Sequence, residues 1–347
     1  HYYIANSFKK NGSSDLAIKS YKKALEISPS FIEALYGLGV LYQELGETNE
    51  AVNHYQKVIE IKPNLAEVHN KAGECFEVLG RLKDALLAFQ KAVDINPLYS
   101  EAYNNLGNTF KAIGQLDDAI KSYKKALDIN PEYPALHNNL GSAYKSLGNH
   151  KDAVKSYLKG LALNPSYIDI LNNLGVAYTE LGEMNEAINT LKKAIAIKPD
   201  YAEAYNNLGV AFNKNSQLEE AVHSFESALK INPDFPDPYN NLTVVFRKQG
   251  LFDHVTMSSK KAIDSMIKYI KTQPNDSDTY NNLGLAYFEI DSLDKAVESF
   301  EVAVSINPRF DEAYYNLGVA LERLHRFDDA IKAFVSAENI KTDTEYS

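Results

Sequence analysis

Apolar residues follow two successive helical patterns, which residues 100–133 show most clearly. The first pattern puts apolar residues at i, i+3, i+7 and i+10 on one helix face: Tyr103, Leu106, Phe110 and Ile113. The second pattern forms another apolar face: Ala119, Ile120, Tyr123, Ala126 and Leu127. Gly114 between them supplies a left-handed helix stop, and Pro131 ends the second helix because proline lacks the backbone N–H. This segment is therefore predicted to be a helical hairpin.

The hairpin pattern repeats along the chain, and the prolines that close each unit mark its period. The prolines spaced by 34 residues are Pro29, Pro63, Pro97, Pro131, Pro165, Pro199 and Pro233. The next spacing, from Pro233 to Pro274, is 41 residues, and the spacing from Pro274 to Pro308 is 34 again. A fixed period of this length indicates a solenoid rather than a set of separate domains.

Composition narrows the classes of function. The 347 residues are 45% hydrophobic and 24% charged, which argues against wholesale disorder. The formal net charge of −10 argues against a general binder of nucleic acid, because such a protein needs a basic face. The chain lacks a run of apolar residues long enough for a transmembrane helix, so we expect no membrane insertion. Its single cysteine, Cys75, excludes an internal disulfide.

The residues that recur in most units resemble those of a known family. In one unit these residues are Leu106-Gly107, Phe110, Ala119, Tyr123, Ala126 and Pro131. In another they are Leu208-Gly209, Phe212, Ala221, Phe225, Ala228 and Pro233. This order resembles the tetratricopeptide repeat (TPR). The resemblance implies an all-α fold, an alpha-alpha superhelix of 34-residue hairpins, in which the first helices line a concave groove.

The resemblance covers the whole chain as a single array. The expected units are a truncated first repeat at 1–31, then repeats at 32–65, 66–99, 100–133, 134–167, 168–201, 202–235, 236–276, 277–310 and 311–344, and a tail at 345–347. Within the family, stretches such as KPDYAEAYNNLG look most like the arrays attached to protein O-GlcNAc transferases and like similar bacterial repeat proteins.

Glycine recurs in the middle of the predicted first helices. The positions are Gly39, Gly73, Gly107, Gly141, Gly175, Gly209, Gly284 and Gly318. Glycine inside a helix costs about 1 kcal/mol relative to alanine. We therefore expect another helix to cross closely at each of these positions.

The motif NNLG recurs along the chain, so its two asparagines form two rows. The second row is our candidate peptide-binding site. These second-row asparagines are Asn105, Asn139, Asn173, Asn207, Asn241, Asn282 and Asn316. The family resemblance places them in the groove, where an amide offers a peptide backbone both a donor and an acceptor. The alternative is that asparagine is simply the default residue of the family at this position.

Apolar and basic residues follow the second row at helical spacing and extend the candidate site. The apolar ones are Val176, Val210, Val244, Leu285 and Val319, while Asn108 and Ser142 fill this position earlier in the chain. The basic ones are Lys111, Lys145, Lys214, Arg247, Lys248 and Arg323. A helix places these residues on or near one inward face, which favours an extended, partly acidic ligand. The alternative for the basic residues is an ordinary solvated rim.

Two further polar rows are assigned structural functions. The first-row asparagines, such as Asn70 and Asn104, are expected at the groove edge or bonded between neighbouring units. A row of acids lies near the starts of the first helices, where acids favour the positive end of the helix dipole. Three pairs fit a capping box: Ser30 with Glu33, Asn64 with Glu67, and Asp200 with Glu203.

No sequence motif for phosphate binding, dinucleotide binding, zinc-protease activity or thiolate metal binding occurs in the chain. We therefore expect a protein that is not an enzyme and that has no catalytic residue, metal or cofactor. Cys75 occupies a position that holds alanine in other units, so we expect a small buried side chain. The first residues show no signal-peptide pattern, which favours a cytoplasmic location and leaves a removed N-terminal signal open.

The unit at residues 236–276 departs from the pattern. Thr243 replaces the mid-helix glycine, Val255 the first alanine and Ser259 the aromatic residue, and seven residues are added before Pro274. An apolar stripe continues through the added segment: Ile263, Ile267 and Ile270. We expect a second helix that is longer by about 10 Å. Its effect is a local change of curvature, or a docking ridge for a partner or another copy of the chain.

Three functions fit this sequence. The leading hypothesis is a non-catalytic scaffold that binds extended protein or peptide segments in its groove. The second is the substrate-recruiting array of a larger transferase, similar to the O-GlcNAc transferases, with its catalytic domain outside this chain. The third is self-assembly into a homo-oligomer through the long unit or the uncovered ends. Whether the native chain continues past Ser347 distinguishes the first two.

Overall fold

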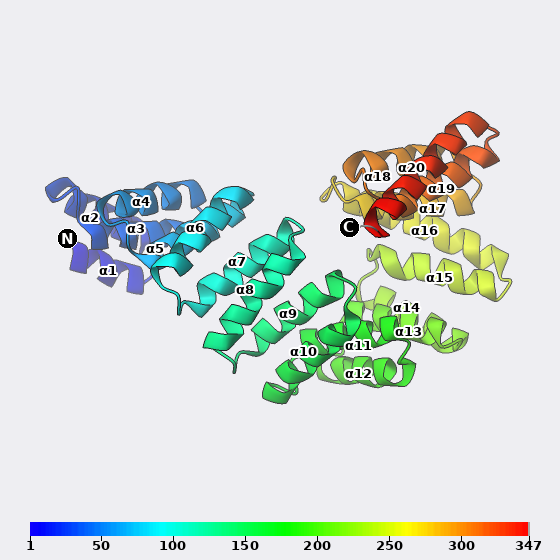
Figure 1. The fold of residues 1–347 in the computed structure, drawn as a ribbon, viewed down its shortest axis with the longest axis horizontal. Helices are drawn as coiled ribbons and strands as arrows, with labels where there is room; N and C mark the ends of the chain where they lie inside the picture. Colours follow the sequence, from blue (N-terminus) through cyan, green and yellow to red (C-terminus); the bar gives the residue numbers. More distant parts are fainter. Residues whose placement is uncertain (346–347) are drawn as a thin grey trace. The chain divides into compact units, whose positions relative to one another are not determined.

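The computed structural model describes residues 1–345, and all regular secondary structure in them is α-helical (Figure 1). The twenty helices of these residues are α1 (Tyr2–Lys10), α2 (Ser14–Ile27), α3 (Ile32–Glu44), α4 (Thr48–Ile61), α5 (Ala66–Val78), α6 (Leu82–Ile95), α7 (Ser100–Ala112), α8 (Leu116–Ile129), α9 (Pro134–Ser146), α10 (His150–Leu163), α11 (Ile168–Leu181), α12 (Met184–Ile197), α13 (Ala202–Lys214), α14 (Leu218–Ile231), α15 (Pro236–Lys248), α16 (Phe252–Ile270), α17 (Ser277–Glu289), α18 (Leu293–Ile306), α19 (Asp311–Arg323) and α20 (Phe327–Glu345).

The chain forms two compact units, one from His1 to Ile170 and the other from Leu171 onward. The boundary falls inside α11. In each unit the helices pair as hairpins that follow one another in a row, as α7 with α8 and α13 with α14 (Figure 1). The all-α fold class predicted from the hairpin pattern is therefore confirmed.

A left-handed residue closes the first helix of each described hairpin. Gly114, for example, has a φ of 79°, and its N–H donates to the carbonyl oxygen of Lys111 at 3.1 Å. The next N–H, that of Gln115, donates back to Phe110 at 2.9 Å. These bonds satisfy carbonyls at the helix end, so the predicted stop is confirmed. Three turns use a residue other than glycine, and Ser216, with a φ of 60°, is one of them.

The core of a hairpin is a side chain of the second helix, in most repeats an aromatic ring, packed on a glycine of the first helix. A Cβ added at Gly209 would lie 2.5 Å from Cε1 of Phe225, and one added at Gly107 would lie 2.7 Å from Cε1 of Tyr123. Both rings are fully buried. The close crossing predicted at the mid-helix glycines is confirmed, because even a methyl group would have to displace a packed ring.

The first helices begin without the predicted side-chain caps. The residues before α3, α5 and α13 are Phe31, Leu65 and Tyr201, and none of them makes a side-chain capping hydrogen bond. The capping-box prediction is wrong at these helices because each helix begins one residue later than that motif requires. The acids nevertheless lie in the first turn, as Glu33 does in α3, where the helix dipole favours negative charge.

The second helix of the long repeat is lengthened, as predicted. α16 has 19 residues, whereas α14 and α18 have 14 each, so the added length is about 7.5 Å. The other added residues belong to the connection that leads to α17. Ile263 and Met266 are buried, and Ile270 packs partly buried beside them against α17. The predicted stripe is wrong at Ile267, which is 39% exposed because it lies on the side of α16 away from that cluster.

Glycine should suit the turn between α13 and α14 better than serine does. A residue with a side chain loses roughly 1–2 kcal/mol in this left-handed conformation. Ser216→Gly removes this strain from the folded chain. The gain is partly offset because glycine has greater conformational freedom in the unfolded chain. We expect the free energy of unfolding, measured by chemical denaturation, to rise by about 0.5–1 kcal/mol. Ser227→Gly inside α14 is the control and should lower it by a similar amount. A loss of stability in Ser216→Gly would contradict the strain at this turn.

Candidate functional site

The first helices of successive hairpins form one face of each unit, which we call the first-helix face. It comprises α1, α3, α5, α7 and α9 in one unit and, in the other, the part of α11 from Leu171 onward with α13, α15, α17 and α19. Successive first helices touch one another, as α5 touches α7 and α13 touches α15, whereas successive second helices in the described residues make fewer contacts. The first-helix face is therefore the inner side of each row, the side on which solenoids bind extended partners.

The two asparagine rows are bonded to each other across neighbouring repeats of this face. In each bridge, Nδ2 of a second-row asparagine donates to Oδ1 of the first-row asparagine in the preceding repeat. The five bridges are Asn105 to Asn70 (3.2 Å), Asn139 to Asn104 (2.9 Å), Asn207 to Asn172 (2.9 Å), Asn241 to Asn206 (2.9 Å) and Asn316 to Asn281 (3.0 Å). Of the two roles predicted for the first row, bonding between units is the one observed.

A bridge uses only part of the hydrogen-bonding capacity of a second-row amide. An asparagine side chain has two N–H donors and a carbonyl oxygen with two lone pairs, and each bridge uses one donor. Asn173, Asn207, Asn241 and Asn316 are half-buried, whereas Asn206 and Asn281, the first-row partners of Asn241 and Asn316, are buried. The candidate peptide-binding row thus ties successive repeats together and keeps part of each amide at the surface of the face.

The bridge pattern is interrupted at the long repeat. Nδ2 of Asn240 points to Sδ of Met266, 3.9 Å away, and the side chain of Asn282 joins none of the bridges between described residues. Both asparagines line a cavity of about 180 Å³ between α15 and α17. A thioether is a weak acceptor, so these two amides keep more of their hydrogen-bonding capacity than the bridged asparagines do.

The apolar residues of the candidate site lie beside the second row. Val176, Val210, Leu285 and Val319 are half-buried, and Val244 is 46% exposed. In the first unit Asn108 and Ser142 make this position polar, and Asn108 accepts a hydrogen bond from the hydroxyl of Tyr123 at 2.7 Å. The first-helix face is therefore more apolar in the second unit than in the first.

The basic residues of the candidate site have partners on adjacent repeats. The ion pairs are Lys214 with Glu180 (3.0 Å), Arg247 with Glu289, and Arg323 with Asp291 (2.9 Å). Lys248 donates to Asn213 at 2.8 Å, and Lys111 donates to Ser142 at 2.7 Å. Burial lowers the pKa of Lys111, and Lys145 is half-buried. Carboxylates of adjacent repeats therefore balance much of the positive charge of these basic residues. That the face attracts an acidic ligand stays a prediction.

Sequence analysis missed a polar cluster around Glu74 on the first-helix face. The carboxylate of Glu74 accepts hydrogen bonds from Gln43, Asn70 and Lys71, each at 2.9 Å. Glu74 lies at the position that Val210 occupies in the second unit. The sequence did contain a signal for this cluster. Glu74 is the one glutamate at a position that holds small or apolar residues in most other repeats.

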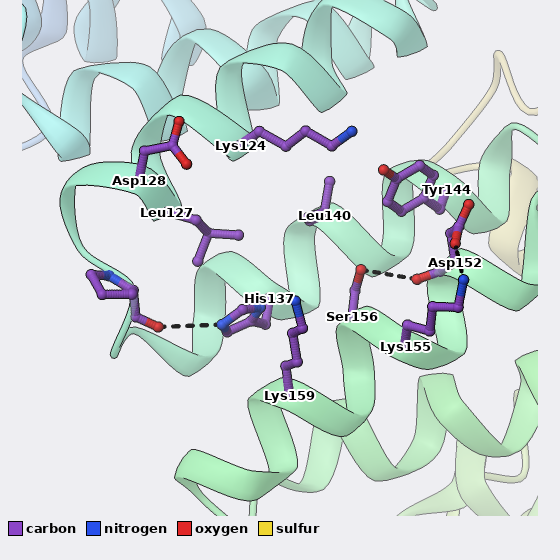
Figure 2. Close-up of a pocket in the computed structure, with 11 residues that line it drawn as sticks. Lys124, Leu127, Asp128, His137, Leu140, Tyr144, Asp152, Lys155, Ser156 and Lys159 are labelled. Carbon is purple, nitrogen blue, oxygen red and sulfur yellow. Dashed lines mark hydrogen bonds and ion pairs between the residues drawn. The ribbon is translucent and has the colours of Figure 1, made fainter.

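A second cavity lies away from the first-helix face, between α8, α9 and α10 (Figure 2). Its volume is about 480 Å³, and an ion pair of Lys155 with Asp152, 2.9 Å long, lies in its wall. A cavity of about 420 Å³ occupies the same place between α14, α15 and α16, with Glu226 in place of Lys124 and His254 in place of Asp152. The recurrence of the space with different chemistry indicates a furrow left by hairpin stacking rather than a specific site.

The single cysteine lies in the core rather than at the candidate site. Cys75 is fully buried, as predicted, and burial raises the pKa of its thiol to about 11. Across the described side chains, histidine, cysteine, aspartate and glutamate form no group of three or more that could hold a metal ion. No described helix combines the length and apolar character that crossing a membrane requires.

Models of the tetratricopeptide repeat match most of the chain. A model described as TPR repeat matches residues 5–46, 107–148, 141–182 and 175–216. Models described as tetratricopeptide repeat match residues 32–65, 88–121, 202–235 and 281–341. Residues 66–87 and residues 236–280, which hold the long repeat, lie outside these matches. No curated protein matches the chain in sequence.

Solved structures of other repeat proteins resemble this chain. A tetratricopeptide repeat protein from Parabacteroides merdae is 20% identical with a TM-score of 0.59, over 74% of this chain and 98% of that one. The C-terminal part of a TPR repeat-containing protein from Cytophaga hutchinsonii is 19% identical with a TM-score of 0.58, over 70% and 99%. MamA is 30% identical with a TM-score of 0.46, over 47% and 95%. At 20% and 19% identity, the first two structures show only that this chain shares their fold.

Removing a bridging amide should cost more stability than removing an unbridged one. Asn241→Ala leaves the buried Oδ1 of Asn206 without its donor, so we expect the free energy of unfolding to fall by about 1–3 kcal/mol. Asn282→Ala is the matched control at the same position of the next repeat and should change it by less than about 0.5 kcal/mol. Urea denaturation of both variants measures the difference. Equal losses would contradict a stabilising function of the bridges.

Proposed function

The chain belongs to the tetratricopeptide repeat family, and from this premise we propose that it is a non-catalytic scaffold that binds extended peptide segments along its first-helix face. Solenoids of such repeats present extended concave surfaces to protein partners. The finer statement, that the ligand is an extended peptide held by second-row amides, rests on the geometry of this face.

The observation that carries the proposal is the row of bridged asparagines. A bridge holds its second-row amide in one orientation, so binding a ligand does not have to immobilise that side chain. Preorganised groups bind more tightly because this entropic cost has already been met in the free protein. The remaining N–H and carbonyl oxygen match the alternating acceptors and donors of an extended peptide backbone.

The apolar residues next to the row supply the second contribution. Val210, Val244 and Leu285 lie one helical turn beyond second-row asparagines, so they lie beside any backbone held by those amides. Burying their exposed area against ligand side chains contributes roughly 25 cal/mol per Å². Apolar side chains of the ligand should therefore favour the second unit, and polar ones the region around Glu74 in the first.

A direct test uses peptides selected on the intact chain from a random twelve-residue display library. We expect selected peptides to bind the second unit and to lose affinity at least tenfold in Val210→Lys, because a charge then lies where apolar area was buried. Fluorescence anisotropy of a labelled selected peptide measures the affinity.

The control adds the same charge on a second helix. Ser305 of α18 is exposed, and Ser305→Lys should leave the affinity unchanged. Failure to select any peptide would overturn the proposal, as would peptides whose affinity responds equally to both variants.

A further inference from the structure

The long repeat lacks the ring that closes the hairpins around it. In the repeats before and after it, Phe225 packs on Gly209 and Phe300 packs on Gly284. The corresponding residues of the long repeat are Ser259 and Thr243. Both are buried, and Ser259 is fully inaccessible. A large side chain has thus been replaced by a small one in the core, which leaves space unless the surroundings collapse.

The position of that ring shows where the space opens. Two tyrosines that occupy the equivalent position elsewhere reach side chains of the first-helix face with their hydroxyls. Tyr123 donates to Asn108 at 2.7 Å, and Tyr55 donates to Gln43 at 2.8 Å. A ring at this position therefore extends from the second helix to the inner surface of the row. When serine replaces it, the emptied volume is continuous with the first-helix face.

The cavity between α15 and α17 is this emptied volume. Ser259 and Thr243 line it together with the apolar side chains of Val244, Leu285 and Ala286, and it measures about 180 Å³. For comparison, an apolar cavity of about 150 Å³ in another protein accepts benzene. The space therefore suits one aromatic ring.

Two hydroxyls provide the polar part of the cavity. Oγ1 of Thr243 donates to the carbonyl oxygen of Tyr239 at 3.0 Å and lies 3.5 Å from Oγ of Ser259. That second distance is too long for a strong hydrogen bond, so the Ser259 hydroxyl has capacity for a better partner. A ring that enters from the first-helix face brings its para substituent nearest to the second helix, where Ser259 lies.

The surroundings of the opening suit a peptide backbone. Asn240 and Asn282 line the cavity and do not bridge to each other as their counterparts do in neighbouring repeats. Arg247 and Glu289 form an ion pair in the same wall. The interruption of the asparagine row and the absence of the ring thus coincide at one step of the array.

We propose that this cavity binds the side chain of a tyrosine in a peptide that lies along the first-helix face. The ring occupies the volume that other repeats fill with their own aromatic residue, and the phenol hydroxyl bonds with Ser259 and Thr243. Asn282 meets the adjacent backbone of the peptide. The identity of the ligand as a peptide rests on the function proposed above, whereas the preference for a phenol rests on the cavity alone.

The cavity is tested with p-cresol, which is the side chain of tyrosine, and with toluene, which is that of phenylalanine. Each is titrated into the intact, methyl-labelled chain and followed by NMR. We expect p-cresol to shift the methyl signals of Thr243, Val244 and Leu285 and to bind about threefold to tenfold more tightly than toluene, the ratio that one net hydrogen bond gives. No shift at these methyls, or equal affinities, would overturn the proposal.

Two variants connect the binding to the emptied volume. Thr243→Gly combined with Ser259→Phe restores the glycine–ring pair of the other repeats, so the chain should fold and p-cresol affinity should fall at least tenfold. Ser259→Ala keeps the space and removes the hydroxyl, so p-cresol should approach the affinity of toluene. Ser305→Ala on α18 is the control and should change neither the affinity for p-cresol nor the affinity for toluene. Unchanged p-cresol binding in the folded double variant would contradict the proposed location.

The selected peptides separate this inference from the general function. If the proposal holds, peptides selected on the intact chain contain a tyrosine whose replacement by alanine weakens binding, and the double variant loses that preference. Peptides that bind without any such preference overturn the tyrosine site and leave the scaffold function standing. Binding of p-cresol without selection of any peptide supports the cavity and overturns the scaffold function.

Discussion

The close contact between a glycine of the first helix and a large side chain of the second helix, usually an aromatic ring, is the interaction on which the structure depends. Glycine weakens the first helix, but it allows the ring of Phe225 or Tyr123 to pack directly on the backbone and to be fully buried. The same ring ends at the inner surface of the row. The contact that holds a hairpin together therefore also closes the first-helix face.

A second interaction connects one hairpin to the next on the same face. The asparagine bridges satisfy buried amides such as Asn206, and they fix the orientation of the second-row amides that remain half-buried. Both interactions are altered together in the long repeat, where Thr243 and Ser259 replace the glycine and the ring and Asn240 turns to Met266. A regular stretch of the face is suited to a backbone of any sequence, whereas this step offers a place for one side chain.

Much of the fold could be predicted from the sequence because its signals are local. The helical spacing of Leu106 and Phe110, the left-handed stop at Gly114 and the close approach at Gly107 each depend on a few neighbouring residues. The bridges join residues that are 35 positions apart, so they depend on how the hairpins stack. The pairing of Arg247 with Glu289 depends on the same stacking. The sequence identified the substitution at Ser259 but not the cavity, because only the packed structure shows that no other side chain fills the space.

The most direct test of this account places alanine at two equivalent positions, Gly209 and Thr243. The new methyl in Gly209→Ala meets the ring of Phe225, so the free energy of unfolding should fall by about 1–3 kcal/mol despite the higher helix propensity of alanine. Thr243→Ala faces Ser259 instead of a ring and should change it by less than about 1 kcal/mol. Chemical denaturation of the two variants gives both values. A Gly209→Ala chain that is as stable as Thr243→Ala would contradict the claim that the ring requires glycine.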